Sequence, residues 1–230
     1  MTTPTEGVIR FDLHHQQGPL PRHLHPALAE LAAWRDLLVR LGGIGQDPTR
    51  YDGAGFGNLS ARIGPFPGPR GQRPFLISAT QTGGEPCADP TRFALVRRCD
   101  ARTNHVESEG PARPSSESLT HGALYDQDPA IRYVFHIHSP HIWRTRAQTR
   151  LPTTHPDIPY GTPAMAQEMN RLAQAGLLAR RIIVMAGHED GVIGFGHTAE
   201  EAGMALISAW VQARALAFEV DGGICVDRLG

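Results

Sequence analysis

A short apolar run that ends in histidines, residues 131–138 (IRYVFHIH), most constrains how this chain can fold. The run is rich in β-branched and aromatic residues, which favour a buried strand. Side chains of a strand alternate between its two faces, so His136 and His138 point the same way while Ile137 points into the other layer. Two imidazoles on one face can bind a single metal ion, and a histidine-rich turn is the ordinary alternative.

The composition excludes several classes of function. The 230 residues suit one domain of ordinary size. All 22 basic residues are arginine, so no lysine can form a Schiff base or hold pyridoxal phosphate. The 23 acidic residues bring the formal charge to −1, so we expect no nucleic-acid partner.

Cysteine usage and hydropathy indicate the compartment. Cys87, Cys99 and Cys225 are scattered and form no CxxC pair, which favours a reducing environment. The N-terminus lacks an apolar core of signal-peptide length, and no later stretch approaches the ~20 apolar residues of a membrane span. We therefore expect a cytoplasmic protein with no membrane partner.

The remaining patterns predict a single α/β domain. Residues 1–24 are polar and carry Pro19 and Pro21, which predicts a flexible N-terminal arm and places the folded domain at 25–230. Helices are predicted over 26–41, 115–128, 162–176 and 198–220. Strands are predicted over 58–63, 75–80, 93–100, 103–109, 131–138, 181–187 and 191–196. The expected fold is a three-layer arrangement in which helices flank a central mixed or antiparallel sheet.

A third metal ligand must come from elsewhere in the chain, and His188 is the best candidate. It follows the apolar run 181–187 and precedes acidic and glycine residues, where a loop would face a cleft. Three histidines leave one coordination position open, as in a catalytic metal site. His141 and His155 are either bystanders or residues that support the ligands.

Glu117 lies nineteen residues before His136, at the first turn of a predicted helix. A carboxylate near a divalent metal can be a fourth ligand or a general base, and burial could raise its pKa. Carboxylates also favour the first turn of a helix for electrostatic reasons, so a structural role stays open.

Three polar segments could bind a phosphate group through their N–H and hydroxyl donors. Two are the glycine-rich turns 55–60 (GFGNLS) and 78–84 (SATQTGG), and the third is the serine pair at the start of the predicted helix at 115. Ordinary turns, whose polar groups satisfy one another, are the alternative.

In order and combination these segments resemble the class II aldolase/adducin family, typified by fuculose-phosphate aldolase. The resemblance runs from about residue 28 to 218. It comprises GNLSAR (57–62), ISATQTGG (77–84), PSSE (114–117), the spacing from Glu117 to HIH, PYGTP (159–163) and GHEDGVIGFGHTAEEA (187–202). It implies an antiparallel sheet flanked by helices, usually in a homotetramer with sites at subunit interfaces.

The resemblance also implies residue roles and a reaction. His136, His138 and His188 match metal ligands, normally for Zn²⁺, although another divalent metal is possible, and Glu117 matches the catalytic acid/base. The residues that match a substrate phosphate cradle are Asn58, Thr82, Gly83, Ser115 and Ser116. The implied protein is a zinc-dependent aldehyde-lyase of carbohydrate metabolism. It would cleave a C–C bond of a small phosphorylated sugar or sugar acid through a metal-stabilised enediolate.

Other outcomes are open within the same family. Decarboxylation or dehydration of a sugar-acid or ketose phosphate uses the same frame. Epimerases typically carry aspartate where Glu117 stands, and non-catalytic adducin-like interaction modules have lost the metal ligands. The chain also departs from the aldolase pattern: its tail, DGGICVDRLG (221–230), offers no tyrosine as proton donor, and the region before His188 offers His155 and Tyr160 instead. His188 is followed by Glu189 and Asp190 rather than directly by glycine.

Overall fold

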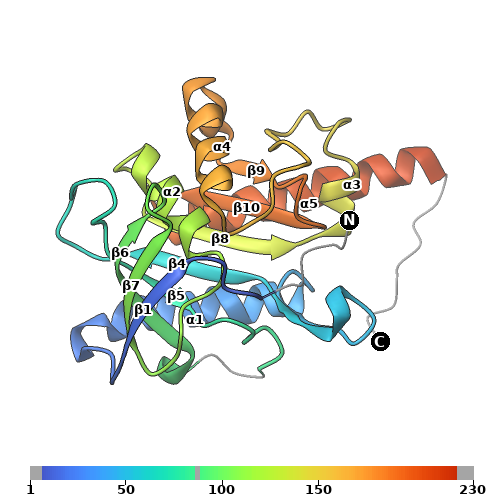
Figure 1. The fold of residues 1–230 in the computed structure, drawn as a ribbon. Coiled ribbons are helices and arrows are strands. Elements are labelled where there is room, and N and C mark those ends of the chain that lie inside the picture. Colours follow the sequence, from blue (N-terminus) through green and yellow to red (C-terminus); the bar gives the residue numbers. More distant parts are fainter. Residues whose placement is uncertain (1–6, 86–88, 222–230) are drawn as a thin grey trace.

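The computed structural model describes residues 7–85 and 89–221, which form a central eight-stranded sheet (Figure 1). The strand order is β1-β7-β6-β5-β4-β8-β10-β9. The strands are β1 (Asp12–Gln17), β4 (Asn58–Arg62), β5 (Phe75–Ser78), β6 (Phe93–Asp100), β7 (His105–Gly110), β8 (Tyr133–His138), β9 (Ile182–Val184) and β10 (Gly191–Gly196). Neighbouring strands are antiparallel except β1 and β7, which are parallel. Two short strands, β2 (Gly45–Gln46) and β3 (Gly55–Phe56), pair separately.

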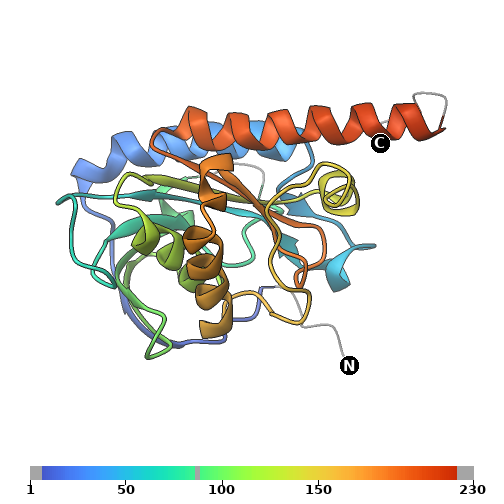
Figure 2. The same cartoon turned by 90° about the horizontal axis from the view of Figure 1, so that it is seen from above.

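Helices cover both faces of the sheet, which gives the predicted three layers. On one face lie α1 (His25–Arg40), α3 (Pro140–Arg144) and the long α5 (Ala199–Asp221), and on the other lie α2 (Ser118–Gln127) and α4 (Pro163–Gln174). Figure 2 shows α1 and α5 along one face, with α2 and α4 opposite. None of the helices in the described residues is long and apolar enough to cross a membrane. The predicted mixed-sheet, three-layer fold is confirmed.

The boundaries of α1 follow from its sequence. Leu28, Leu31 and Leu38 recur at helical spacing and are buried against the sheet, each contributing roughly 1.5–3 kcal/mol. Pro26 stands in the first turn, where its missing N–H costs nothing. Gly42 adopts a φ of +74° just past the last turn, a conformation that glycine takes without strain.

Strand β8 places the histidines as predicted. Phe135 and Ile137 pack into the layer that contains α1 and α5, whereas Val134 packs into the layer that contains α2 and α4. Because side chains alternate along a strand, His136 and His138 share the face of Val134. Both histidines therefore lie on the α2 side of the sheet.

The flexible arm expected over residues 1–24 is wrong for Asp12–Gln17, which form the edge strand β1. This strand pairs in parallel with β7, from Asp12 opposite His105 to Gln17 opposite Gly110. The apolar side chains of Phe11, Leu20 and Leu24 are buried on either side of it and hold the segment to the domain. Residues 1–6 of the expected arm, and the tail residues 222–230, lie outside the described residues.

Candidate functional site

The three predicted histidines come together in one buried cluster. Their candidate ligand atoms lie within 4.8 Å of one another, and the exposed fractions of His136, His138 and His188 are 0%, 1% and 5%. His188 lies in the turn between β9 and β10. The carbonyl of Asp190 in that turn accepts a hydrogen bond from the N–H of Ser139 at 2.8 Å, which ties the turn to the end of β8.

Glu117 contacts two of the three imidazoles. Its Oε1 lies 3.0 Å from Nδ1 of His188, and its Oε2 lies 3.4 Å from Nε2 of His136. Glu117 occupies the N-cap position of α2, but its side chain makes no capping hydrogen bond. The carboxylate thus faces the histidine cluster instead of the helix backbone.

The electrostatics of the cluster suit a cation. Burial alone would raise the pKa of Glu117, but interactions with His136 and His188, including a hydrogen bond with His188, lower it to about 2, the opposite of the rise expected from burial. Burial and the neighbouring rings hold the pKa of His138 well below its ordinary value, so its ring is neutral. Imidazoles bind a metal ion in their neutral form, and three of them beside a carboxylate are a donor set that fits a zinc-type divalent ion.

The structure brings the three predicted phosphate-binding segments side by side. The N–H of Ser115 donates to the carbonyl of Ser78 at 3.2 Å, which joins the serine pair to the turn 78–84. Gly83 packs so closely on β3 that an added Cβ would lie 2.8 Å from the N of Phe56. Asn58 stands opposite His136 in the β4–β8 pairing. Asn58 therefore links the predicted phosphate-binding segments to the strand that carries His136.

Some of these groups are already engaged within the turns. The hydroxyl of Thr82 donates to the carbonyl of Ala79 at 2.9 Å, and Oγ of Ser115 accepts from the N–H of Glu117 at 3.2 Å. Oδ1 of Asn58 is buried and has no hydrogen-bond partner in residues 7–85 and 89–221. Ser116 is 3% exposed.

His141 and His155 lie away from the converging ligand atoms. Nε2 of His141 is 3.2 Å from a guanidinium nitrogen of Arg214 on α5. The ring of His155 is exposed and lies 3.6 Å from the carboxylate of Asp157. Neither histidine belongs to the group that could share an ion with the trio.

Two tyrosines pack on the ligand candidates. Tyr51 meets His138 edge-on with ring centroids 4.5 Å apart, and its hydroxyl donates to Oδ2 of Asp190 at 2.7 Å. Arg50 lies 3.4 Å from the same carboxylate oxygen. Tyr160, one of the two residues noted in place of the family tyrosine, stacks on His188 at 4.4 Å.

The sequence patterns did not reveal Tyr51 and Asp190 as neighbours of the cluster. Both adopt positive φ angles, 52° and 60°, which non-glycine residues seldom take and which periodicity does not predict. The one sequence feature that pointed to Asp190 was the pair Glu189 and Asp190 between His188 and the next glycine.

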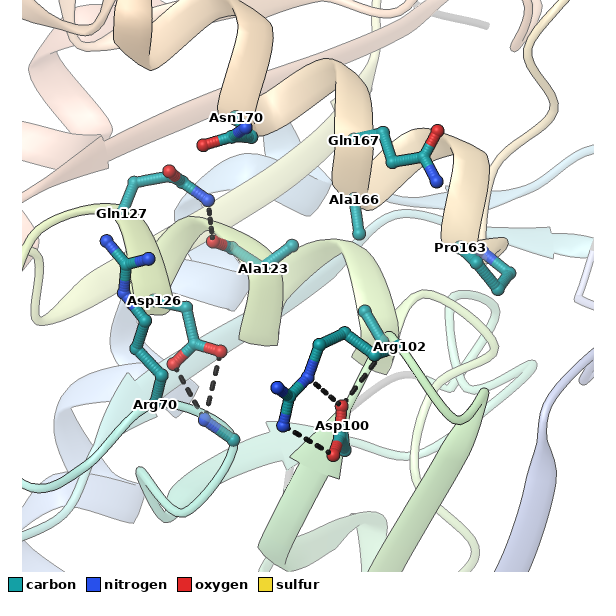
Figure 3. A pocket seen from close by; sticks show the side chains of 12 residues that line it. Arg70, Asp100, Arg102, Ala123, Asp126, Gln127, Pro163, Ala166, Gln167 and Asn170 are labelled. Carbon is teal, nitrogen blue, oxygen red and sulfur yellow. Dashed lines mark hydrogen bonds and ion pairs between the residues drawn. The ribbon is translucent and has the colours of Figure 1, made fainter.

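A cavity of ≈ 590 Å³ lies elsewhere, between α2, α4 and the turn that joins β6 to β7 (Figure 3). In this cavity Arg102 pairs with Asp100 at 3.3 Å, and Asp126 accepts from the N–H of Gly71 at 3.0 Å. No candidate site residue lines it. Its acidic groups are already engaged, so we assign the chemistry to the histidine cluster.

Comparisons with known proteins agree with this fold. The model of the class II aldolase and adducin N-terminal domain family matches residues 48–215. A sugar-phosphate aldolase from Thermotoga maritima is similar in structure, with 17% identity, a TM-score of 0.66 and coverage of 88% of this chain and 98% of that one. An L-fuculose 1-phosphate aldolase shares 19% identity at a TM-score of 0.61, covering 90% of this chain and 91% of that one. The L-fuculose-1-phosphate aldolase from Thermus thermophilus shares 18% identity at a TM-score of 0.58, covering 86% of this chain and 98% of that one.

Proposed function

Because the chain belongs to the class II aldolase and adducin family, we propose that it is a metal-dependent lyase that cleaves a C–C bond of a small phosphorylated sugar or sugar acid. One observation carries this proposal: three buried histidines converge within 4.8 Å, and the Glu117 carboxylate lies 3.0 and 3.4 Å from two of them. A non-catalytic module of this family would not need that arrangement.

His136, His138 and His188 would hold the ion, and zinc suits three imidazoles best. A bound divalent metal supplies electrophilic polarisation of substrate oxygens and offsets the negative charge that develops during cleavage. Glu117 lies beside the ligands and would accept the proton of the hydroxyl group next to the breaking bond. The bond then breaks to an aldehyde and an enediolate, and the enediolate takes up a proton at carbon.

The cradle formed by Asn58, Thr82, Gly83, Ser115 and Ser116 would bind the substrate phosphate. Hydrogen bonds from backbone N–H groups and hydroxyls can hold a dianion where no lysine is available. We further propose a cytoplasmic homotetramer of carbohydrate metabolism, on the strength of the family resemblance.

Metal analysis of the purified protein is the first test. We expect about one divalent metal per chain, and its loss from the double variant His136→Ala/His138→Ala. The matched control is His155→Ala, which removes an exposed histidine outside the cluster and should keep the metal. Unchanged metal content in the double variant would refute the site.

A substrate screen of the metal-loaded protein is the second test. L-Fuculose 1-phosphate, other ketose phosphates and phosphorylated sugar acids should be followed by NMR, which identifies the products. An aldehyde product supports retro-aldol cleavage, whereas carbon dioxide or loss of water would identify the decarboxylase or dehydratase alternatives. Absence of bound metal together with no turnover of any compound would favour the adducin-like interaction module.

A further inference from the structure

A fourth histidine, His121, is fully buried one helical turn after Glu117 in α2. Its Nδ1 lies 2.7 Å from Oγ of Ser60 on β4. The same Oγ lies 2.6 Å from the hydroxyl of Tyr125, which stands one turn further along α2. These three side chains form a continuous hydrogen-bonded chain with no exposed surface.

This chain abuts the candidate site. Ser60 and Asn58 are two residues apart on β4, so they share a face of the sheet, and Asn58 is paired with His136. Residues four apart on a helix also share a face, which places His121 on the same side of α2 as Glu117. Burial is the largest effect on the pKa of His121 and lowers it to about 3, although the charge of Glu117 acts in the opposite direction. The ring is therefore neutral and carries one proton.

The hydrogen bonds indicate which nitrogen carries that proton. If Tyr125 donates to Ser60 and Ser60 donates to Nδ1 of His121, both short contacts are well-formed bonds and the proton resides on Nε2. In the opposite tautomer Nδ1–H would donate to Oγ of Ser60, and the Ser60 proton would go either to the 3.4 Å contact with the carbonyl of Val134 or to Tyr125. In the second case the hydroxyl proton of Tyr125 would have no acceptor among the described residues, so one donor is poorly satisfied either way. The opposite tautomer would also leave Nε2 of His121 without a proton, and the charge of the Glu117 carboxylate disfavours a lone pair there.

Nε2 of His121 is buried and has no hydrogen-bond partner within residues 7–85 and 89–221. The same holds for Oδ1 of Asn58 on the adjoining strand face. Buried polar atoms are almost always satisfied, and a buried water molecule typically bonds two to four of them. A water molecule at this place could accept from Nε2–H of His121 and donate to the Glu117 carboxylate and to Oδ1 of Asn58.

We propose that His121 is a positioning residue: its Nε2–H, oriented by Tyr125 and Ser60, donates to a water molecule that in turn holds the Glu117 carboxylate. The carboxylate would then keep one orientation toward the substrate hydroxyl between turnovers. This inference rests on the proposed role of Glu117 in proton transfer.

The tautomer can be measured without any substrate. Long-range proton–nitrogen correlation spectra of the ¹⁵N-labelled full-length protein distinguish a protonated Nε2 from a protonated Nδ1. We expect His121 to be protonated at Nε2 alone from pH 6 to 8. Protonation at Nδ1 would overturn the proposal, and this result would stand even if the protein proved to cleave no sugar phosphate.

Two substitutions then test the effect on catalysis, with L-fuculose 1-phosphate as the first probe or, failing that, whichever compound the screen identifies. Tyr125→Phe removes the first donor of the chain and should lower kcat about tenfold while KM changes less than twofold. The control Tyr133→Phe removes a hydroxyl that donates to Glu30 outside the site and should leave kcat unchanged. An unchanged kcat in folded Tyr125→Phe would contradict the proposal.

Two replacements of His121 distinguish a role of its N–H donor in orienting Glu117 from a role of its ring in filling space. His121→Gln keeps an N–H donor near the position of Nε2 and should retain more of kcat than His121→Leu, which has none. Both variants should retain the metal. Equal losses of kcat in the two variants would show that the ring only fills space.

Discussion

Replacement of Arg35 by methionine should both destabilise the fold and weaken phosphate binding. Arg35 stands in α1, is 3% exposed, and directs one guanidinium nitrogen, Nη2, toward three carbonyl oxygens. The distances are 2.6 Å to Thr82, 3.2 Å to Gly83 and 2.9 Å to Glu85. This one side chain therefore fixes the turn that carries two residues of the proposed cradle.

The size of the destabilisation follows from the number of protons that Nη2 of Arg35 can donate. Nη2 carries two protons, so the three contacts amount to at most two full hydrogen bonds, each worth about 1.5–3 kcal/mol when the donor is charged. Methionine recovers part of the packing of the aliphatic stem. Two such bonds contribute about 3–6 kcal/mol, and we expect a loss of about 3 kcal/mol in the free energy of unfolding, the lower end of that range.

Urea denaturation measures this loss. With a slope of about 3 kcal/mol per molar urea, the midpoint of Arg35→Met should fall by about 1 M. The matched control is Arg40→Met on the same helix, where the exposed Arg40–Asp36 pair should contribute about 0.3–0.5 kcal/mol. Phosphate, as a competitive ligand, should also bind more weakly to Arg35→Met than to the control. Equal midpoints for the two variants, or unchanged phosphate binding, would refute the reasoning.

Three further predictions concern the site and the assembly. Glu117→Gln should keep the fold and the metal but lose about 10²-fold or more of turnover, as general acid–base groups do; near-normal rates would return Glu117 to a structural role. Ser115→Ala/Ser116→Ala should raise KM for a phosphorylated substrate more than it lowers kcat, and inorganic phosphate should compete with that substrate. Equal turnover of unphosphorylated sugars would contradict the cradle. Light scattering should show a tetramer, and a monomer at assay concentration would count against the assembly.

The histidines of β8 were predictable because alternation along a strand is a local rule. To predict the positions of His136 and His138, only the strand that carries them had to be recognised. To predict the position of His188, the end of the next buried strand had to be recognised. The contact between Glu117 and the rings depends on how α2 packs over β8, which spacing in the sequence does not contain. The family resemblance, not periodicity, anticipated it.

Other features were hidden because long-range packing decides them. Strand β1 (DLHHQQ) lacks an alternating apolar pattern, and its pairing with β7 joins segments some ninety residues apart. Tyr51 and Asp190 meet through backbone conformations that oppose ordinary preferences. A histidine within an apolar helix, as at His121, is more often an ordinary core residue, so its hydrogen-bonded chain appears only in three dimensions.

Strand β1 protects the rest of the sheet from other chains. Without it, the backbone groups of β7 that now pair with residues 12–17 would form an open edge, and such an edge is a template for intermolecular β-pairing and fibril growth. Proteolysis before Gly18 should therefore promote polymerisation of an otherwise folded domain. Asp12 and His14 are exposed on β1, and charged or polar side chains make an outer edge a poor partner for a further strand. The polar composition that conceals this strand from pattern analysis is also what allows it to terminate the sheet.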